Sequence, residues 1–328
     1  MTLFEPNTNL MGMGCWPIGG EMHNGDVSLG YSRSDDAEAI RAIHAALDAG
    51  INLFDTAAAY GAGHADRLLA QALRGRGEAM IVTKIGLQVD EATKQVTAPD
   101  PDPAHVMPAI DRCLDRLERE CIDILLLHVN DMGLAVAEPL FDQMESARAA
   151  GKIRAYGWST DFTASAEAMA DRDGFVAVEH AMNVFLDAPR MQAALDARGL
   201  TPLIRSPLAM GLLGGGYGAD SVLPGDDVRA SDQNWVAYFR HGRPNPEFLA
   251  RLDAVRELLQ SGGRSLAQGA ICWLWGRSPA CIPLPGARTA VQILDSAGAM
   301  SHGPLPPVVM TEIETLMPRT PDSEDRAR

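Results

Sequence analysis

Four polar residues, Asp55, Tyr60, Lys84 and His128, have the chemical types needed to move a proton at a carbonyl or alcohol. Asp55 and Tyr60 share the segment FDTAAAYG, whereas Lys84 and His128 close the apolar runs IVTK and ILLLH. The set combines a phenol that donates a proton, an ammonium, a carboxylate that holds the ammonium, and an orienting imidazole. A free tyrosine has a pKa of about 10, so we expect Lys84 to lower the pKa of Tyr60.

Each of these residues also has an ordinary structural interpretation. Tyr60 could pack as a loop aromatic, and a Lys84–Asp55 ion pair could stabilise the fold without any chemistry. His128 alone would more often be a structural histidine than a catalytic one. The coincidence of all four at the ends of apolar runs favours the chemical interpretation.

Short apolar runs alternate with helical patterns along the whole chain. Strands are expected near 10–15, 50–55, 79–84, 122–128, 153–158, 175–180, 201–206 and 280–284. The first helix is expected in SDDAEAIRAIHAALDAG, with Ser34 as its N-cap and Gly50 beyond its end. Later helices are expected near 64–74, 104–119, 138–150, 163–171, 187–198, 246–260, 265–277 and 289–299. This alternation predicts a single (β/α)8 TIM barrel over residues 1–328, with chemistry at the carboxyl ends of its strands.

Three segments interrupt the alternation. Residues 214–246 are rich in Gly, Pro, Asp and aromatics, and are longer than an ordinary loop. They are expected either to cover a ligand, through Trp235, Tyr238 and Phe239, or to pack their own aromatics on the barrel rim. A shorter polar insertion, QVDEATKQVTAPDPDP, follows the third strand, and the acidic tail PDSEDRAR is expected to be frayed.

Composition narrows the classes of function. A formal charge of −15 argues against general binding to nucleic acid or an anionic membrane. No run approaches the ~20 apolar residues of a membrane helix. The five cysteines show no metal-binding spacing, and no signal peptide is evident, so a cytoplasmic protein without a metal is expected. The oligomeric state is left open.

Several motifs together resemble the aldo-keto reductase superfamily over nearly the whole chain. They are MGMGCWPIGG, GINLFDTAAAYG, IVTKIG, IDILLLH, IRAYGWST, IRSPLAMGLL and IPLPGARTAVQILDSAGA. The resemblance implies a (β/α)8 fold that uses NADP(H) without a Rossmann domain. It also implies that Tyr60 protonates the substrate oxygen, that Lys84 and Asp55 tune Tyr60, and that His128 hydrogen-bonds the carbonyl oxygen.

The same resemblance implies a set of cofactor-binding residues. Arg288 corresponds to the 2′-phosphate contact, which favours NADP(H) over NAD(H). Thr160 and Ser296 replace the usual asparagines, and Glu179 replaces a glutamine beneath the nicotinamide. Arg205 takes the position of a ring-stacking tyrosine, where a planar guanidinium can also stack. The full set is Ser159, Thr160, Glu179, Arg205, Ser206, Leu208, Gly211, Gly286, Arg288, Gln292, Asp295 and Ser296.

Glu179 suggests a sharper hypothesis. A carboxylate near the ring favours the oxidised, positively charged nicotinamide, and hence oxidation of an alcohol or sugar. The alternative is that Glu179 is protonated or turned away from the ring.

The leading hypothesis is an NADP(H)-dependent oxidoreductase acting on a small aldehyde, ketone or sugar. The alternative is a nucleotide-binding regulatory subunit with little turnover. A metal-dependent barrel hydrolase is disfavoured because no HxH pair lies near a strand end. Trp16, Tyr60 and His128 are expected to line the substrate pocket, but the substrate itself cannot be read from the sequence.

Overall fold

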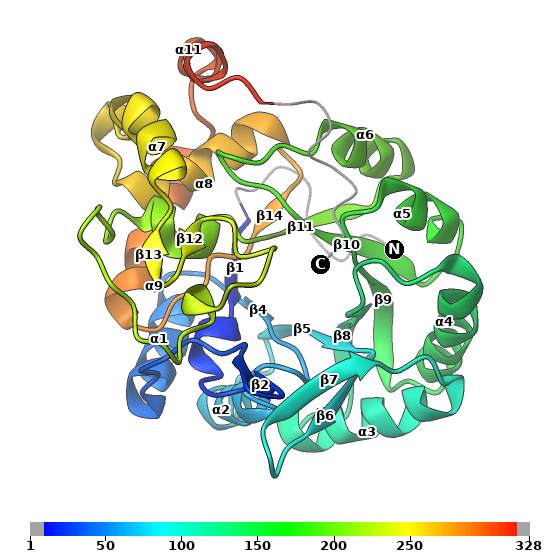
Figure 1. Ribbon diagram of the computed structural model, residues 1–328. Coiled ribbons are helices and arrows are strands. Elements are labelled where there is room, and N and C mark those ends of the chain that lie inside the picture. Colours follow the sequence, from blue (N-terminus) through cyan, green and yellow to red (C-terminus); the bar gives the residue numbers. More distant parts are fainter. Residues whose placement is uncertain (1–9, 320–328) are drawn as a thin grey trace.

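The protein forms one barrel of parallel strands, seen in a computed structural model that describes residues 10–319. Figure 1 shows helices surrounding this ring of strands. The strands, in their order around the described sheet, are β1 (Gly12–Gly14), β4 (Leu53–Asp55), β5 (Met80–Ile85), β8 (Ile122–Leu127), β9 (Ile153–Ser159), β10 (Phe175–Ala181), β11 (Thr201–Arg205) and β14 (Ile282–Pro283). The expected (β/α)8 fold is confirmed. The tail PDSEDRAR lies outside the described residues.

The helices cover the outside of the ring in the expected alternation. They are α1 (Asp36–Asp48), α2 (His64–Ala72), α3 (Val106–Leu117), α4 (Leu134–Ala149), α5 (Thr163–Met169), α6 (Pro189–Arg198), α7 (Pro246–Leu259), α8 (Leu266–Arg277), α9 (Ala290–Ala297), α10 (Ala299–His302) and α11 (Pro307–Leu316). Helix α4 begins four residues earlier than expected and contains Pro139, and α10 and α11 were not expected.

Local capping explains where α1 begins. The Asp35 carboxylate accepts a hydrogen bond from the Glu38 backbone N–H at 2.8 Å, so Asp35 is the N-cap. The expectation of Ser34 was wrong by one residue, because the Ser34 hydroxyl lies against Gly20 instead. Gly50 lies just beyond the helix with φ +88°, a conformation that favours glycine at a helix end.

The barrel closes through a short contact between its first and last segments. Gly14 forms a single parallel bridge with Gly286, and its N–H donates to the Pro285 carbonyl at 3.0 Å. A Cβ on Gly14 would lie 2.9 Å from the Leu284 carbonyl oxygen. Closure therefore requires a glycine at this position.

Two layers of apolar packing support the strands. The larger layer lies between strands and helices, and includes Phe141 and Trp158. The smaller fills the barrel interior and consists of Leu53, Val82, Ile124, Leu126, Ala177, Leu203, Ile282 and Leu284. The interior of the barrel is thus a packed core, with space for a ligand only beyond it.

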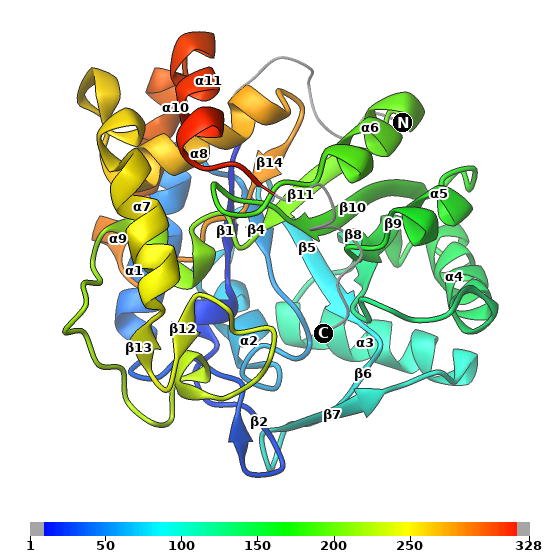
Figure 2. The same ribbon diagram turned by 45° about the horizontal axis from the view of Figure 1, so that its top comes forward.

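Short additional strands gather at one end of the barrel (Figure 2). The polar insertion forms the hairpin β6 (Leu87–Asp90) and β7 (Gln95–Pro99). Strand β7 pairs with β2 (His23–Asn24), which in turn pairs with β3 (Val27–Ser28). The 214–246 segment contains β12 (Phe239–Arg240) and β13 (Arg243–Pro244). The arrow of β5 points to this end, so these elements surround the carboxyl ends of the strands.

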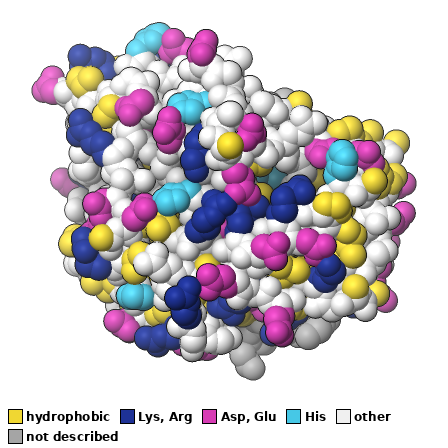
Figure 3. All heavy atoms as spheres, turned by 90° about the horizontal axis from the view of Figure 1, so that it is seen from below, with side chains coloured by type: hydrophobic (Ala, Val, Ile, Leu, Met, Phe, Trp, Pro, Cys, Tyr) yellow, Lys and Arg dark blue, Asp and Glu magenta, His cyan; other side chains and the backbone are white. Residues whose placement is uncertain are grey.

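Acidic and basic side chains are mixed on the face shown in Figure 3. A short run of basic side chains crosses the middle of this face and is bordered by acidic ones. Surface pairs such as Arg74–Glu118 at 3.0 Å and Arg172–Asp142 at 2.9 Å show the same local mixing. The positive charge on this face is therefore locally compensated.

Candidate active site

The polar residues of the site continue the inward-facing rows of their strands. Asp55, Lys84 and His128 each lie two residues beyond an apolar residue of the barrel interior, and so do Glu179 and Arg205. Side chains two residues apart on a strand point to the same face. Because side chains alternate between the two faces of a strand, these five side chains all point into one space beyond the interior core.

Lys84 is the centre of the cluster and is fully buried. Its Nζ donates to Asp55 Oδ1 at 2.5 Å, to the Thr56 carbonyl at 2.9 Å and to the Tyr60 hydroxyl at 3.2 Å. The fourth neighbour of this nitrogen is Glu179 Oε2, at 3.1 Å. The structure thus brings the expected phenol, ammonium and carboxylate into direct contact, and adds a second carboxylate.

The charges in this cluster shift each other's protonation. Burial alone would lower the pKa of Lys84, but the carboxylates of Asp55 and Glu179 outweigh it and raise that pKa. Burial, together with the Glu179 carboxylate, raises the pKa of Asp55 against the opposing effect of Lys84. Lys84 is therefore a permanent cation in this site.

The pKa of Tyr60 differs from the expectation. Burial raises the pKa of its phenol above the ordinary value, and the Lys84 ammonium opposes this effect without overcoming it. The expected net lowering of the pKa was wrong, because burial raises it more than Lys84 lowers it, and the carboxylates of Asp55 and Glu179 add to the rise. Tyr60 is a neutral hydroxyl that can donate a proton.

His128 lies beside the Tyr60 ring, with ring centroids 5.9 Å apart in an edge-on arrangement. Burial lowers its pKa to about 3, and the cations of Lys84 and Arg205 contribute to this shift. The imidazole is therefore neutral near pH 7. A neutral imidazole retains one N–H that can donate to a substrate oxygen.

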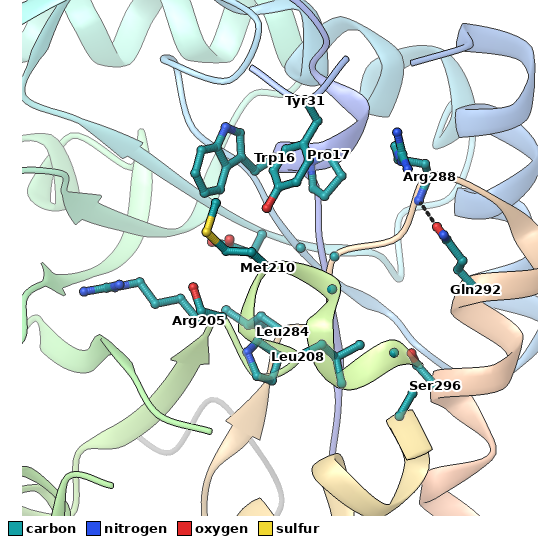
Figure 4. Close-up of a pocket in the computed structure, with 18 of the residues that line it drawn as sticks. Trp16, Pro17, Tyr31, Arg205, Leu208, Met210, Leu284, Arg288, Gln292 and Ser296 are labelled. Atoms are coloured by element: carbon teal, nitrogen blue, oxygen red, sulfur yellow. Dashed lines mark hydrogen bonds between the residues drawn. The ribbon is translucent and has the colours of Figure 1, made fainter. Parts of the chain in front are cut away.

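A pocket of about 400 Å³ connects this cluster to the region around Arg288. Figure 4 shows Arg205 and Arg288 extending to opposite sides of the pocket, with Leu208 and Leu284 between them. Site residues expected from the sequence that line the pocket are Trp16, Asp55, Tyr60, His128, Glu179, Arg205, Ser206, Leu208, Gly211, Gly286, Arg288, Gln292, Asp295 and Ser296. An elongated ligand that meets Tyr60 could thus also reach Arg288.

Ser159 and Thr160 do not line the pocket. The Ser159 hydroxyl is buried and donates to Glu179 Oε1 at 3.1 Å. The Thr160 hydroxyl donates to the Asn130 carbonyl at 2.6 Å, so this side chain anchors the loop after β8. The Thr160 hydroxyl therefore has a backbone partner within the protein, and its contact with a cofactor stays a prediction.

Arg205 lines the pocket but has a partner of its own. Its Nη2 donates to Asp161 Oδ2, and Asp161 Oδ1 also accepts from the Ala181 N–H at 2.8 Å. Asp161 was not singled out in the sequence. The pair directs the Arg205 guanidinium away from Arg288 (Figure 4).

The segment from Ser206 to Gly211 has an uncommon backbone. Ser206, Ala209 and Met210 have φ values of 55°, 49° and 56°, and Gly211 has φ 97°. Left-handed conformations of non-glycine residues are costly and cluster where backbone is shaped for a ligand. Backbone turned in this way exposes N–H groups that can bind an anion.

Arg288 lies immediately before the N-cap of α9, which is Thr289. Its backbone N–H donates to Gln292 Oε1 at 2.8 Å, and its Nη1 donates to the Ser32 carbonyl at 2.9 Å. Asp295 and Ser296 follow on the same helix and also line the pocket. Within residues 10–319 the guanidinium pairs with no carboxylate and donates to the Ser32 carbonyl, so it remains available to a phosphate.

The 214–246 segment contributes to the pocket through residues that were not expected. Tyr217 and Arg229 line it, whereas Tyr238 and Phe239 are buried in the core. Trp235 lies 6.0 Å from Trp16, centroid to centroid. Nothing in the sequence distinguished Arg229 from a surface arginine.

Arg229 is held in place by several partners. Its Nε and Nη2 donate to the two oxygens of Asp227 at 2.7 and 2.8 Å, and its Nη1 donates to the Tyr217 hydroxyl at 2.7 Å. Asp227 in turn accepts from the Ser32 hydroxyl at 3.1 Å. These contacts fix the position of the 214–246 segment where it lines the pocket together with Trp16 and Tyr31.

Trp16 stacks on Tyr60, with ring centroids 6.1 Å apart, and its Nε1 donates to the Leu29 carbonyl at 3.1 Å.

Among residues 10–319, no group of three or more His, Cys, Asp or Glu side chains is arranged to hold a metal ion. In the same range, no helix has the length and apolar character needed to cross a membrane.

Comparison with known proteins identifies the family. The chain is 29% identical to aldo-keto reductase YhdN of Bacillus subtilis, over 86% of this chain and 82% of that protein. It is 28% identical to 6-dehydroglucose reductase of Novosphingobium aromaticivorans, over 80% of this chain and 81% of that protein. The glycerol dehydrogenase AKR11B4 of Gluconobacter oxydans has a similar structure, with a TM-score of 0.78, 28% identity, and coverage of 95% of this chain and 93% of that one.

The profile of the "Aldo/keto reductase family" matches residues 11–317, which is nearly the whole chain. The matched range contains the Lys84 cluster, the pocket and the Arg288 helix. The chain therefore belongs to the aldo/keto reductase family of oxidoreductases.

Proposed function

We propose that this protein is an NADP(H)-dependent oxidoreductase that transfers a hydride between nicotinamide and the carbonyl or alcohol carbon of a small aldehyde, ketone or sugar. The observation that carries the proposal is the Tyr60 hydroxyl, which lies 3.2 Å from the buried Lys84 amine at the wall of a pocket that extends to Arg288. A proton donor and a phosphate-binding cation therefore share one cavity.

Each protein group has a role that its geometry supports. In reduction, the Tyr60 hydroxyl donates its proton to the substrate oxygen, and in oxidation the same oxygen takes the proton back. Lys84, held by Asp55 at 2.5 Å, fixes the position of the Tyr60 oxygen and stabilises negative charge on it. The neutral His128 donates a hydrogen bond to the substrate oxygen from the edge of the Tyr60 ring.

The pocket residues fit a dinucleotide phosphate. When bound, the nicotinamide supplies or accepts the hydride. The turned backbone of Ser206–Gly211 and the close approach at Gly286 suit the pyrophosphate, and Arg288 suits a 2′-phosphate. A Cβ on Gly286 would lie 2.7 Å from the Pro17 ring, which supports a backbone kept bare at this point.

The substrate end of the pocket combines flat aromatic walls with polar groups. Trp16 and Tyr31 contact each other edge-on with centroids 5.1 Å apart, beside Tyr60 and His128. The names of two relatives, glycerol dehydrogenase and 6-dehydroglucose reductase, indicate small polyhydroxylated substrates. We therefore include polyols and sugars among the candidate substrates. The 214–246 segment, through Tyr217 and Arg229, would cover the pocket.

A direct assay tests the proposal. Purified protein is mixed with NADPH and a panel of aldehydes, ketones and dehydro-sugars, or with NADP⁺ and polyols, and the absorbance of the reduced nicotinamide is followed. Turnover with at least one substrate, faster with the phosphorylated cofactor than with NADH or NAD⁺, is expected. Nucleotide binding without turnover across the panel would favour a regulatory subunit, and absence of nucleotide binding would overturn the proposal.

A further inference from the structure

Glu179 carries a buried carboxylate oxygen that has no hydrogen-bond donor among the described residues. The side chain is 1% exposed, yet it lines the pocket beside Tyr60 and His128. Its Oε1 accepts from Ser159, whereas Oε2 accepts from no described group. Buried polar atoms are usually satisfied, so an exception on a pocket wall requires an explanation.

The donors of Lys84 explain why this oxygen is left over. An ammonium has three hydrogens, and these are directed at Asp55 Oδ1, the Thr56 carbonyl and the Tyr60 hydroxyl. Glu179 Oε2 is the fourth oxygen around the nitrogen, at 3.1 Å. Glu179 is therefore attracted by the charge of Lys84 without receiving one of its hydrogen bonds.

Carboxyl groups outnumber unpaired cations in this wall of the pocket. Lys84 contributes one positive charge, whereas Asp55 and Glu179 contribute two carboxylates. The other cation on this wall, Arg205, is paired with its own carboxylate, Asp161, and His128 is neutral near pH 7. Burial and the hydrogen-bonded contact with Glu179 raise the pKa of Asp55, so Asp55 takes up a proton above its ordinary range. The carboxylate charge of Glu179 then faces both the Lys84 ammonium and the pocket.

This charge lies next to the reacting atoms. Glu179 Oε2 and the Tyr60 hydroxyl contact the same Lys84 nitrogen, so the two oxygens are close neighbours. The carbon that exchanges a hydride must lie beside the substrate oxygen that Tyr60 protonates. A nicotinamide placed there is close to Glu179. The oxidised ring carries a positive charge, and the reduced ring is neutral.

We propose that Glu179 makes this site discriminate between the redox states of its cofactor, so that it binds NADP⁺ more tightly than NADPH and favours oxidation of an alcohol. A carboxylate attracts the cationic ring and has no such attraction for the neutral one. An amide at the same position would lack this preference. The inference rests on the proposed function, because it requires that the pocket bind the nucleotide.

Comparison of Glu179→Gln with the wild type tests the proposal through binding alone. The substitution removes the charge and keeps the size of the side chain. Dissociation constants for NADP⁺ and NADPH are measured by calorimetry at one pH and one salt concentration. A neighbouring opposite charge changes the stability of a charged form by about 10-fold to 1000-fold. We expect the NADP⁺/NADPH affinity ratio to fall at least tenfold, mainly through weaker binding of NADP⁺.

Asp123→Asn provides the matched control. Asp123 is also buried on a barrel strand, where it accepts from the Ile81 N–H at 2.8 Å and pairs with Arg154 at 3.3 Å. It lies at the start of β8, the end of the strand opposite to His128. Loss of one carboxylate there should leave the affinity ratio unchanged.

The outcomes separate this inference from the proposed function. If both nucleotides bind and Glu179→Gln retains the wild-type ratio, the inference is wrong and the proposed function stands. If neither nucleotide binds the wild type, the proposed function fails and the inference fails with it. Should Glu179→Gln not fold, as judged by circular dichroism, the wild type decides: tighter binding of NADP⁺ supports the inference, and equal or tighter binding of NADPH overturns it.

Discussion

The Lys84 cluster and the Arg116 cluster each place one buried cation between two carboxylates, but they satisfy them differently. Arg116 donates from Nε to Asp66 Oδ2 and from Nη1 to Glu91 Oε1, both at 3.0 Å. Asp66 Oδ1 accepts from the Thr56 hydroxyl at 2.8 Å, and Glu91 also pairs with Arg67. In the Lys84 cluster, Glu179 Oε2 receives no hydrogen bond from the described residues.

Under the proposed function, this difference distinguishes a structural ion pair from one that takes part in the reaction. Arg116 offers more donors than its two carboxylates need, and neither it nor Asp66 lines the pocket. Lys84 has fewer donors than neighbouring acceptors, and three of its neighbours, Asp55, Tyr60 and Glu179, form the pocket wall. Because structural ion pairs also bury charge, we base the proposed role of the Lys84 cluster on its place in the pocket wall and not on buried charge alone.

Tyr60→Phe should have the largest effect. Removal of the hydroxyl leaves the Lys84 cluster charged and packed, but deletes the proton donor, so turnover should fall about 10²- to 10⁴-fold. Nucleotide affinity should change little. Steady-state rates and nucleotide titrations measure the two effects. A variant with near-normal rates would show that another group transfers the proton.

Lys84→Met and Arg116→Met compare the two clusters directly. Each leaves a buried carboxylate without its cation, so each should lower the free energy of unfolding by about 3–5 kcal/mol. Only Lys84→Met should also abolish turnover in the protein that remains folded. Denaturant unfolding and rates per folded molecule provide the readouts. Equal loss of turnover in both variants would remove the distinction between the clusters.

The pocket histidine should make stability depend on pH. Burial lowers the pKa of His128 to about 3 in the folded protein, whereas an unfolded histidine has a pKa of about 6.5. The unfolded chain therefore binds the extra proton first, and stability falls as pH decreases from about 6.5 toward 3. At pH 5 this loss is about 2 kcal/mol.

His128→Gln should remove this loss and flatten the dependence of Tm on pH below 6.5. His180, whose pKa burial lowers to about 4, should still contribute a slope. Thermal unfolding at a series of pH values checks the prediction. A slope identical to that of the wild type would mean that His128 does not stay neutral in the fold.

Arg288→Ala should have the smallest effect and one limited to binding. This arginine is half-buried and contacts the Ser32 carbonyl at 2.9 Å, so its loss should leave stability nearly unchanged. Affinity for NADPH should weaken about tenfold or more, and that for NADH much less, because only NADPH has a 2′-phosphate. Competitive titrations with both nucleotides measure the difference. Equal weakening would remove the 2′-phosphate assignment.

Several features of the site were predictable because they depend on local periodicity. A residue two positions beyond an interior apolar residue points to the same face, so Asp55, Lys84 and His128 had to share the space above the barrel core. The motif around Arg288 likewise placed a cation at the start of a helix. The additional hairpin β6–β7 was missed, because short exposed strands carry little apolar pattern.

The chain's own pattern of strand ends and helix caps thus established the barrel, its reactive end and the types of side chain gathered there. The hydrogen bonds and protonation states of those side chains were decided by the tertiary structure, because they depend on groups contributed by separate strands. Four oxygens converge on the three hydrogens of Lys84, Thr160 turns to Asn130, and burial outweighs the ammonium at Tyr60. Such counts of donors, acceptors and charges exist only once distant segments meet.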